Sequence, residues 1–95
     1  MIDSVEIRHR SKGTVLEPIT VKQNGKKYEV VIRGSGLDPG ATVFVSGREM
    51  KISTASETEV VARLRSGTLS EPGVLVIAVA NPDGLRSDDF PIEVQ

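Results

Sequence analysis

Turn-forming residues divide this chain into short segments, and this division constrains the fold more than any other feature. Nine glycines and five prolines are spread over 95 residues. No window carries apolar residues at the i, i+3, i+4, i+7 spacing over two helical turns, and Pro or Gly interrupts nearly every segment long enough for a helix. The sequence therefore predicts short strands joined by turns, with little helix.

Between the turns, apolar and polar side chains alternate with a period of two. Tyr28, Val30 and Ile32 share one side of a segment, while Glu29 and Arg33 take the other. The expected strands are residues 28–33, 42–46, 48–53, 58–64, 74–80 and 90–94, preceded by a first strand split between 5–10 and 19–21. About seven strands at this spacing predict one all-β domain over residues 1–95, an antiparallel β-sandwich whose residues 1–18 form an irregular or split first strand.

The residues of inward parity predict a single core between two sheets. They are Tyr28, Val30, Ile32, Val43, Val45, Val60, Ala62, Leu64, Leu75, Ile77, Val79, Phe90, Ile92 and Val94.

Composition argues against several kinds of site and partner. The chain has no cysteine, which removes disulfides, thiolate nucleophiles and Cys-ligated metals. Its longest apolar segment, residues 74–80, is far shorter than the ~20 residues of a membrane span, so membrane insertion is not expected. Residues 1–4 lack the basic start of a signal peptide. Membrane-spanning and thiol-based functions are therefore set aside.

Charge and aromatic content argue against nucleic acid as a partner. The net charge is −1, with seven Lys/Arg against four Asp/Glu in residues 1–33 and five against nine in residues 34–95. Only three side chains are aromatic, and none is Trp. A nucleic-acid binder would usually show a strong basic excess and aromatic residues for stacking.

No pattern predicts a catalytic residue, a cofactor or a metal. The only histidine, His9, lies among Arg8, Arg10 and Lys12 without a second histidine or a cysteine, and is interpreted as a strand residue. No G-x-S-x-G motif accompanies it, so a hydrolase triad has no support.

Four aspartates in or beside turns raise the question of a loop calcium site. They are Asp38, Asp83, Asp88 and Asp89. Backbone hydrogen bonding in turns accounts for aspartates at such positions, and no D-x-D-x-D-G run is present. A calcium site is left open on this basis, although no metal is expected.

The glycine-rich segment "GSGLDPGATVFVSG", residues 34–47, follows one strand and precedes another. Its spacing is not G-x-G-x-x-G, and no helix follows whose N-terminus could bind a phosphate. It is interpreted as a bend between strands. Pro39-Gly40 predicts a type II turn with Gly40 at positive φ.

Three motifs in order resemble the IPT/TIG family of immunoglobulin-like domains: "VVIRGSGLDPGATVFVSG", "SETEVVARL" and "GVLVIAVANPDGLRS". The resemblance covers about residues 19–95, and its most telling parts are the turn at 34–40 and the sequence of residues 81–84. Residues 1–18 are longer and more charged than the family pattern.

The resemblance implies a non-catalytic module of a larger extracellular or cell-surface protein. Such domains act as spacers and interaction units in bacterial surface proteins, receptors, polysaccharide enzymes and transcription factors, where they can dimerise. The implied partners are neighbouring domains, another protein or a second copy of the chain. An accessory domain that binds a polysaccharide or a protein is the alternative.

One strand departs from alternation and predicts an interaction face. Phe44, Val76 and Ala78 have outward parity yet are apolar, and contiguous exposed apolar surface often marks a contact site. The competing interpretations are strand propensity alone, or cover from residues 1–18.

Overall fold

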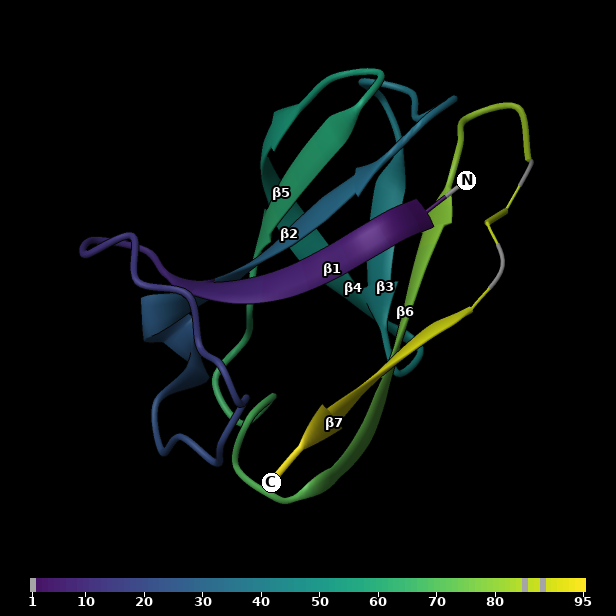
Figure 1. The fold of residues 1–95 in the computed structure, drawn as a ribbon. Coiled ribbons are helices and arrows are strands. Elements are labelled where there is room, and N and C mark those ends of the chain that lie inside the picture. The colour runs from purple at the N-terminus through teal and green to yellow at the C-terminus, as the bar shows by residue number, and fades with distance from the viewer. Residues whose placement is uncertain (1, 85, 88) are drawn as a thin grey trace.

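The computed structural model describes residues 2–84, 86–87 and 89–95. These residues form seven antiparallel strands and one short 3-10 turn (Figure 1). The elements are β1 (Ile2–His9), η1 (Gly25–Lys27), β2 (Tyr28–Gly34), β3 (Thr42–Val45), β4 (Arg48–Ala55), β5 (Glu59–Arg63), β6 (Gly73–Ala80) and β7 (Phe90–Val94). Hydrogen bonding joins them in the order β1-β2-β5-β4-β3-β6-β7. The expected all-β fold of about seven antiparallel strands is confirmed.

Strand β4 belongs to two layers. Residues 48–50 pair with β3, and residues 51–55 pair with β5. The register shifts between Ile52 and Thr54, and such a bulge bends a strand and increases its twist. The sheet therefore turns over on itself into a β2 layer (β1, β2 and β5) and a β6 layer (β3, β6 and β7).

The core lies between these layers and draws residues from all seven strands. Every residue predicted for the core is either buried in it or packed against it, so that prediction is confirmed. The buried set also includes residues that alternation did not assign: Ile7, Leu37, Ala41, Met50 and Leu69. Leu37 and Leu69 come from connections, where strand periodicity does not apply.

The first 21 residues contribute to both layers. Strand β1 pairs with β2, and the Leu16 amide then donates to the Ile7 carbonyl at 2.8 Å. Farther along, Val21 N–H donates to Gln95 at 3.0 Å, and Gln95 N–H donates to Ile19 at 2.8 Å. These two bonds follow the pattern of a parallel pair beside the end of β7.

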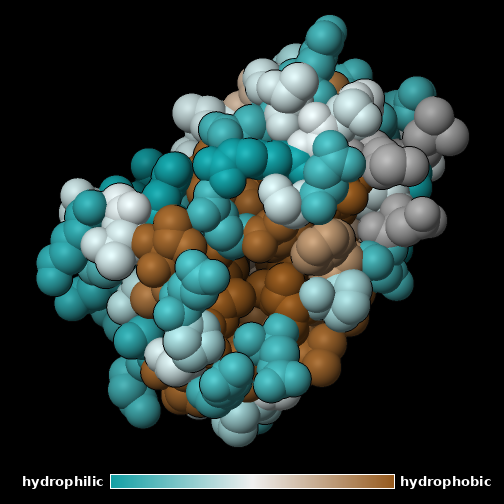
Figure 2. Space-filling view, in the orientation of Figure 1, coloured by the Kyte–Doolittle hydropathy of each residue, from teal (hydrophilic) through white to brown (hydrophobic). Residues whose placement is uncertain are grey.

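The sheet remains open between its two end strands, β1 and β7, which lie side by side (Figure 1). Apolar side chains gather in the space between them, with polar side chains around (Figure 2). On β7, Pro91 stands opposite Val76 of β6. The Val76 amide and carbonyl both bond to Ser46 on the far side of β6. Pro91 is therefore in a non-hydrogen-bonded pair. Its backbone nitrogen, which carries no hydrogen, faces away from β6, so no hydrogen bond of the sheet is lost.

The bend at residues 34–41 corrects one prediction. Gly40 does not have positive φ; in this bend Gly36 does, at 67°. Asp38 explains the difference, because its Oδ1 accepts the Gly40 N–H at 2.7 Å while its carbonyl accepts the Ala41 N–H at 2.9 Å. Asp at the first and Pro at the second position suit a type I turn, which needs no positive φ.

Candidate functional site

The structure brings the three residues of the predicted interaction face together. Phe44 on β3 stands opposite Ala78 on β6, and Val76 lies two residues away on the same side of β6. Ala78 is only 1% exposed, whereas Phe44 and Val76 are half-buried and Val74, again on this side, is 60% exposed. Phe44, Val74, Val76 and Ala78 form what we call the Phe44 face, with Ala78 as its floor.

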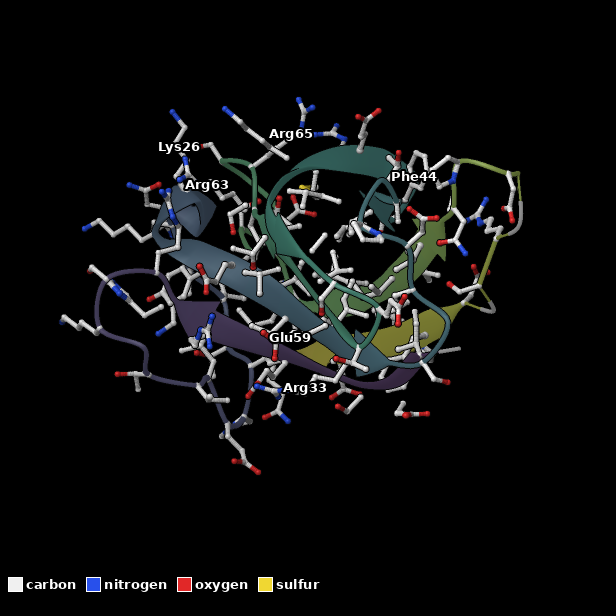
Figure 3. All side chains as sticks on the ribbon, turned by 90° about the horizontal axis from the view of Figure 1, so that it is seen from above. Lys26, Arg33, Phe44, Glu59, Arg63 and Arg65 are labelled. Carbon is white, nitrogen blue, oxygen red and sulfur yellow. The ribbon has the colours of Figure 1, made fainter. Side chains whose placement is uncertain are left out.

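The described chain covers this face in part, because Ala78 is buried while Phe44 and Val76 are half-buried. The guanidinium carbon of Arg86 lies 5.8 Å from the centroid of the Phe44 ring, a cation–π distance. Strand β1 pairs with β2 in the other layer, so the first strand does not lie over the Phe44 face. In Figure 3, Phe44 lies to the right of the molecule, at a distance from Lys26 and Arg63 on the left.

The outer side of the β2 layer carries an apolar pair that, unlike the Phe44 face, is covered by neighbouring side chains. Val31 and Val61 stand opposite each other and are buried at 0% and 4% exposure. Beside them Arg33 pairs with Glu6 and, at 3.1 Å, with Glu59. The Glu6 hydrogen bond raises the pKa of Arg33 above its ordinary value. Aliphatic stems of such paired side chains can shield an apolar strip from water. On the Phe44 face, Arg86 lies over the Phe44 ring, and Glu49 and Glu93 stand opposite Phe44 and Val74, but neither glutamate forms an ion pair with a described residue.

A second surface was not predicted from the sequence. Eight of the twelve lysines and arginines line two adjoining hollows of about 630 and 590 Å³. We call these eight the basic surface: Arg10, Lys12, Lys26, Lys27, Arg48, Lys51, Arg63 and Arg65. Three of them, Arg10, Lys26 and Arg63, line both hollows. Lys26, Arg63 and Arg65 lie along one side of the molecule, away from Arg33 and Glu59 (Figure 3).

A glycine positions one half of the basic surface against the other. A Cβ on Gly25 would lie 2.8 Å from the carbonyl oxygen of Arg65, so only glycine lets η1 approach the end of β5 this closely. The Arg10 guanidinium holds the same turn by donating to the Lys26 carbonyl at 2.9 Å. Cations before residue 28 therefore lie beside those of β4 and β5.

Within the described residues, none of the eight basic side chains forms an ion pair. Glu29 is the only carboxylate in the lining of the two hollows, and it pairs instead with Arg8 of β1. Lys51 and Arg63 stand directly opposite each other across the β4–β5 pair. Like charges in that position lower stability, so this surface carries an electrostatic cost.

The remaining sequence candidates take structural positions. His9 ends β1, where its Nδ1 accepts the Lys12 amide at 3.1 Å and its ring meets Tyr28 edge-on at 5.2 Å. Asp38 serves the turn described above, and Asp89 lies 3.5 Å from Arg86. Across the described residues no group of three His, Cys, Asp or Glu could hold a metal.

Asp83 lies in the turn after β6, and Asp88 is outside the described residues. No helix within the described ranges is long and apolar enough to cross a membrane.

The two turns that carried the sequence resemblance pack against each other. Asn81 Nδ2 donates to the Gly36 carbonyl at 3.3 Å, and Pro82 lies against Gly40, where an added Cβ would be 3.1 Å from its Cγ. Together with two facing layers and a first strand whose continuation reaches the second layer, this arrangement defines an immunoglobulin-like module.

The chain belongs to the IPT/TIG domain family, whose model matches residues 14–94. The predicted immunoglobulin-like β-sandwich is thereby confirmed. Domains of this family are generally non-catalytic and are often parts of larger proteins. No curated protein and no solved structure matches the chain significantly.

Proposed function

We propose that this chain is a non-catalytic spacer module of a larger extracellular or cell-surface protein. In this role it packs against a neighbouring domain, a protein partner or a second copy of itself through the Phe44 face. The observation that carries the proposal is the exposure of that face: Val74 is 60% exposed, and Phe44 and Val76 are only half-buried.

The physical reason is the cost of leaving apolar surface in water. An antiparallel sheet with one solvated side normally alternates, and β6 instead reads apolar on both sides from Val74 to Ala80. Covering the outer row with another apolar surface would contribute about 25 cal/mol for each Å² removed from water. The alternative of an accessory ligand-binding domain draws on a different part of the molecule, the basic surface.

Charged substitutions on the Phe44 face test the proposal. Phe44→Glu and Val76→Lys should leave the circular dichroism spectrum intact and abolish association, measured by sedimentation of the chain alone and within its larger protein. Val15→Glu is the matched control, because Val15 is an exposed apolar residue (40%) outside the face. Unfolding of both variants would mean that the face is part of the core. Unchanged association would mean that it is exposed without being a contact.

A further inference from the structure

The distribution of charge on this molecule is far more uneven than its net charge of −1 suggests. The basic surface holds eight of the twelve Lys/Arg, and a single carboxylate, Glu29, lines its hollows. The remaining four basic residues share the rest of the molecule with twelve of the thirteen Asp/Glu. Such a one-signed region attracts anions and raises their local concentration.

We propose that the basic surface binds an anionic polysaccharide, a chain of sugars bearing carboxylates or sulfates, laid across its two hollows. This site is separate from the Phe44 face and does not depend on the function proposed for that face. It assigns a ligand chemistry to residues that neither the core nor the turns require.

The first support is the opposed pair of cations at its centre. Lys51 and Arg63 face each other on β4 and β5, where opposite charges would stabilise the sheet and like charges destabilise it. Neither forms an ion pair with a described residue. Glu29 stands opposite Arg63 on β2, but it forms its ion pair with Arg8, so this row of the sheet holds one carboxylate for three cations. A local conflict that is only partly compensated is typical of functional sites, and a bound anion would supply further compensation.

The second support is the shape of the surface. Two hollows of about 630 and 590 Å³ share Arg10, Lys26 and Arg63, so they form one continuous open depression with cations along its length. A linear polyanion can contact both halves at once, whereas one small anion would fill only part of either. Hydroxyls of Ser11, Ser53 and Ser66 also line it and offer neutral hydrogen-bonding groups to sugar hydroxyls.

An acidic peptide fits this surface less well. Strands β2 and β5, which form its floor with β4, each pair with neighbours on both sides. They therefore have no free edge to which an extended peptide could add as a further strand. Only residues 51–55 of β4, which pair with β5 alone, leave one side of a floor strand unpaired. A flexible sugar polymer needs no such edge, because charged groups and hydroxyls carry its recognition.

Single-stranded nucleic acid and membrane also fit less well. The Phe and Tyr side chains are engaged elsewhere: Tyr28 packs on the core and against His9, Phe90 packs on the core, and Phe44 lies on β3 beside β6. None of these three lines either hollow. His9 does line the first hollow, but its ring is held edge-on against Tyr28 and its Nδ1 accepts the Lys12 amide. The series of aromatic platforms that holds successive nucleic-acid bases is therefore missing from the hollows. The large exposed apolar residues, Val15 and Val74, are outside the lining too, which leaves no apolar anchor for a lipid surface.

Binding to heparin, polygalacturonate and neutral dextran tests the proposal on the whole chain by calorimetry. Heparin and polygalacturonate separate sulfate from carboxylate recognition, and dextran controls for the sugar backbone. The test variant is Lys26→Gln/Arg63→Gln, since neither side chain forms a hydrogen bond or ion pair with a described residue. The control is Lys22→Gln/Arg86→Gln, which removes the same charge outside the basic surface.

We expect at least one of the two polyanions to bind and dextran not to bind. The test variant should weaken binding at least tenfold with no loss of melting temperature, and the control should stay within twofold. If about five of the eight cations contact the polymer, a slope of about −0.7 per charge gives a log–log salt slope of about −3.5, and affinity should then fall about 100-fold between 50 and 200 mM salt. Phe44→Glu should bind as the unchanged protein does, which separates this test from that of the Phe44 face.

Three results would overturn the proposal. Failure of both polyanions to bind would show that the basic surface is not a polysaccharide site. Equal weakening of binding by the test and control variants would show that binding depends on net charge and not on this surface. Tighter binding of a DNA oligonucleotide, an acidic peptide or phosphatidylserine vesicles, lost in the same test variant, would assign the surface to that other class of partner.

Discussion

Lys51 and Arg63 occupy directly opposed positions on neighbouring strands β4 and β5, two cations where a sheet would gain from opposite charges. Both side chains are exposed, and Arg63 lines both hollows of the basic surface. Sheet stability would favour opposite charges at this pair, whereas anion binding favours two cations. The effect of their repulsion on the free energy of unfolding can be measured.

Replacing Lys51 by glutamate should stabilise the domain. We expect Lys51→Glu to raise the free energy of unfolding by about 0.2–1 kcal/mol at low ionic strength, because it converts a repulsive cross-strand pair into an attractive one. The gain should shrink in 1 M salt, where charges are screened within about 3 Å. Urea titrations at two salt concentrations measure both effects, with Lys22→Glu as control. A loss of stability would show that Lys51 has an attractive partner.

Two residues of the same strand should respond very differently to truncation. Ile77→Ala should cost about 2–5 kcal/mol, since Ile77 is fully buried in the core between the layers. Val74→Ala should change stability by less than about 0.5 kcal/mol, because Val74 is 60% exposed. Denaturant titration of the two variants decides this. A loss below about 0.5 kcal/mol for Ile77→Ala would place that side chain outside the core.

Adding one methyl group at Gly25 should destabilise the chain by about 1–3 kcal/mol. The new Cβ would meet a backbone oxygen, that of Arg65, at 2.8 Å, so η1 or the end of β5 must move. Gly40→Ala is the comparison, because its Cβ would meet a ring carbon of exposed Pro82 at 3.1 Å and should cost less. Equal costs in thermal unfolding would contradict this account of the η1 contact.

The Ser87 hydroxyl should matter more than its half-buried position suggests. It accepts the Val79 amide at 2.9 Å, while the Ser87 amide donates to the Val79 carbonyl at 2.8 Å. Ser87→Ala leaves the amide of a buried residue without that acceptor, and we expect a loss of about 1–3 kcal/mol. Ser70→Ala removes an exposed hydroxyl that donates to Gly67, and should change the unfolding midpoint little. Hydrogen exchange at Val79 provides the local measurement.

The sequence predicted the parts of this fold that depend on local alternation. Inward parity identified the core because side chains of successive strand residues point to opposite faces. The prediction of positive φ at Gly40 was wrong, because Pro39-Gly40 suits two turn types and the Asp38 carboxylate favours the type without positive φ. Leu69 was missed because it is buried from a connection without strand periodicity.

The Phe44 face and the basic surface differ in how visible they are in a sequence. Phe44 and Ala78 could be grouped because both break alternation on predicted strands. The basic surface joins Lys26 to Arg63 through strand register and the Gly25 contact, and neither can be derived from spacing along the chain. The one feature of the sequence that indicates the basic surface is the excess of Lys/Arg over Asp/Glu in residues 1–33.

Pro91 has a consequence for how copies of this domain can coexist. Its ring stands at the outward edge of β7. An unpaired strand edge presents backbone donors and acceptors that can pair with another extended chain. One position of the β7 edge has no donor, and a rigid ring occupies it. Two copies of this domain that meet at this edge would therefore lack one backbone hydrogen bond, which disfavours edge-to-edge pairing into amyloid-like stacks.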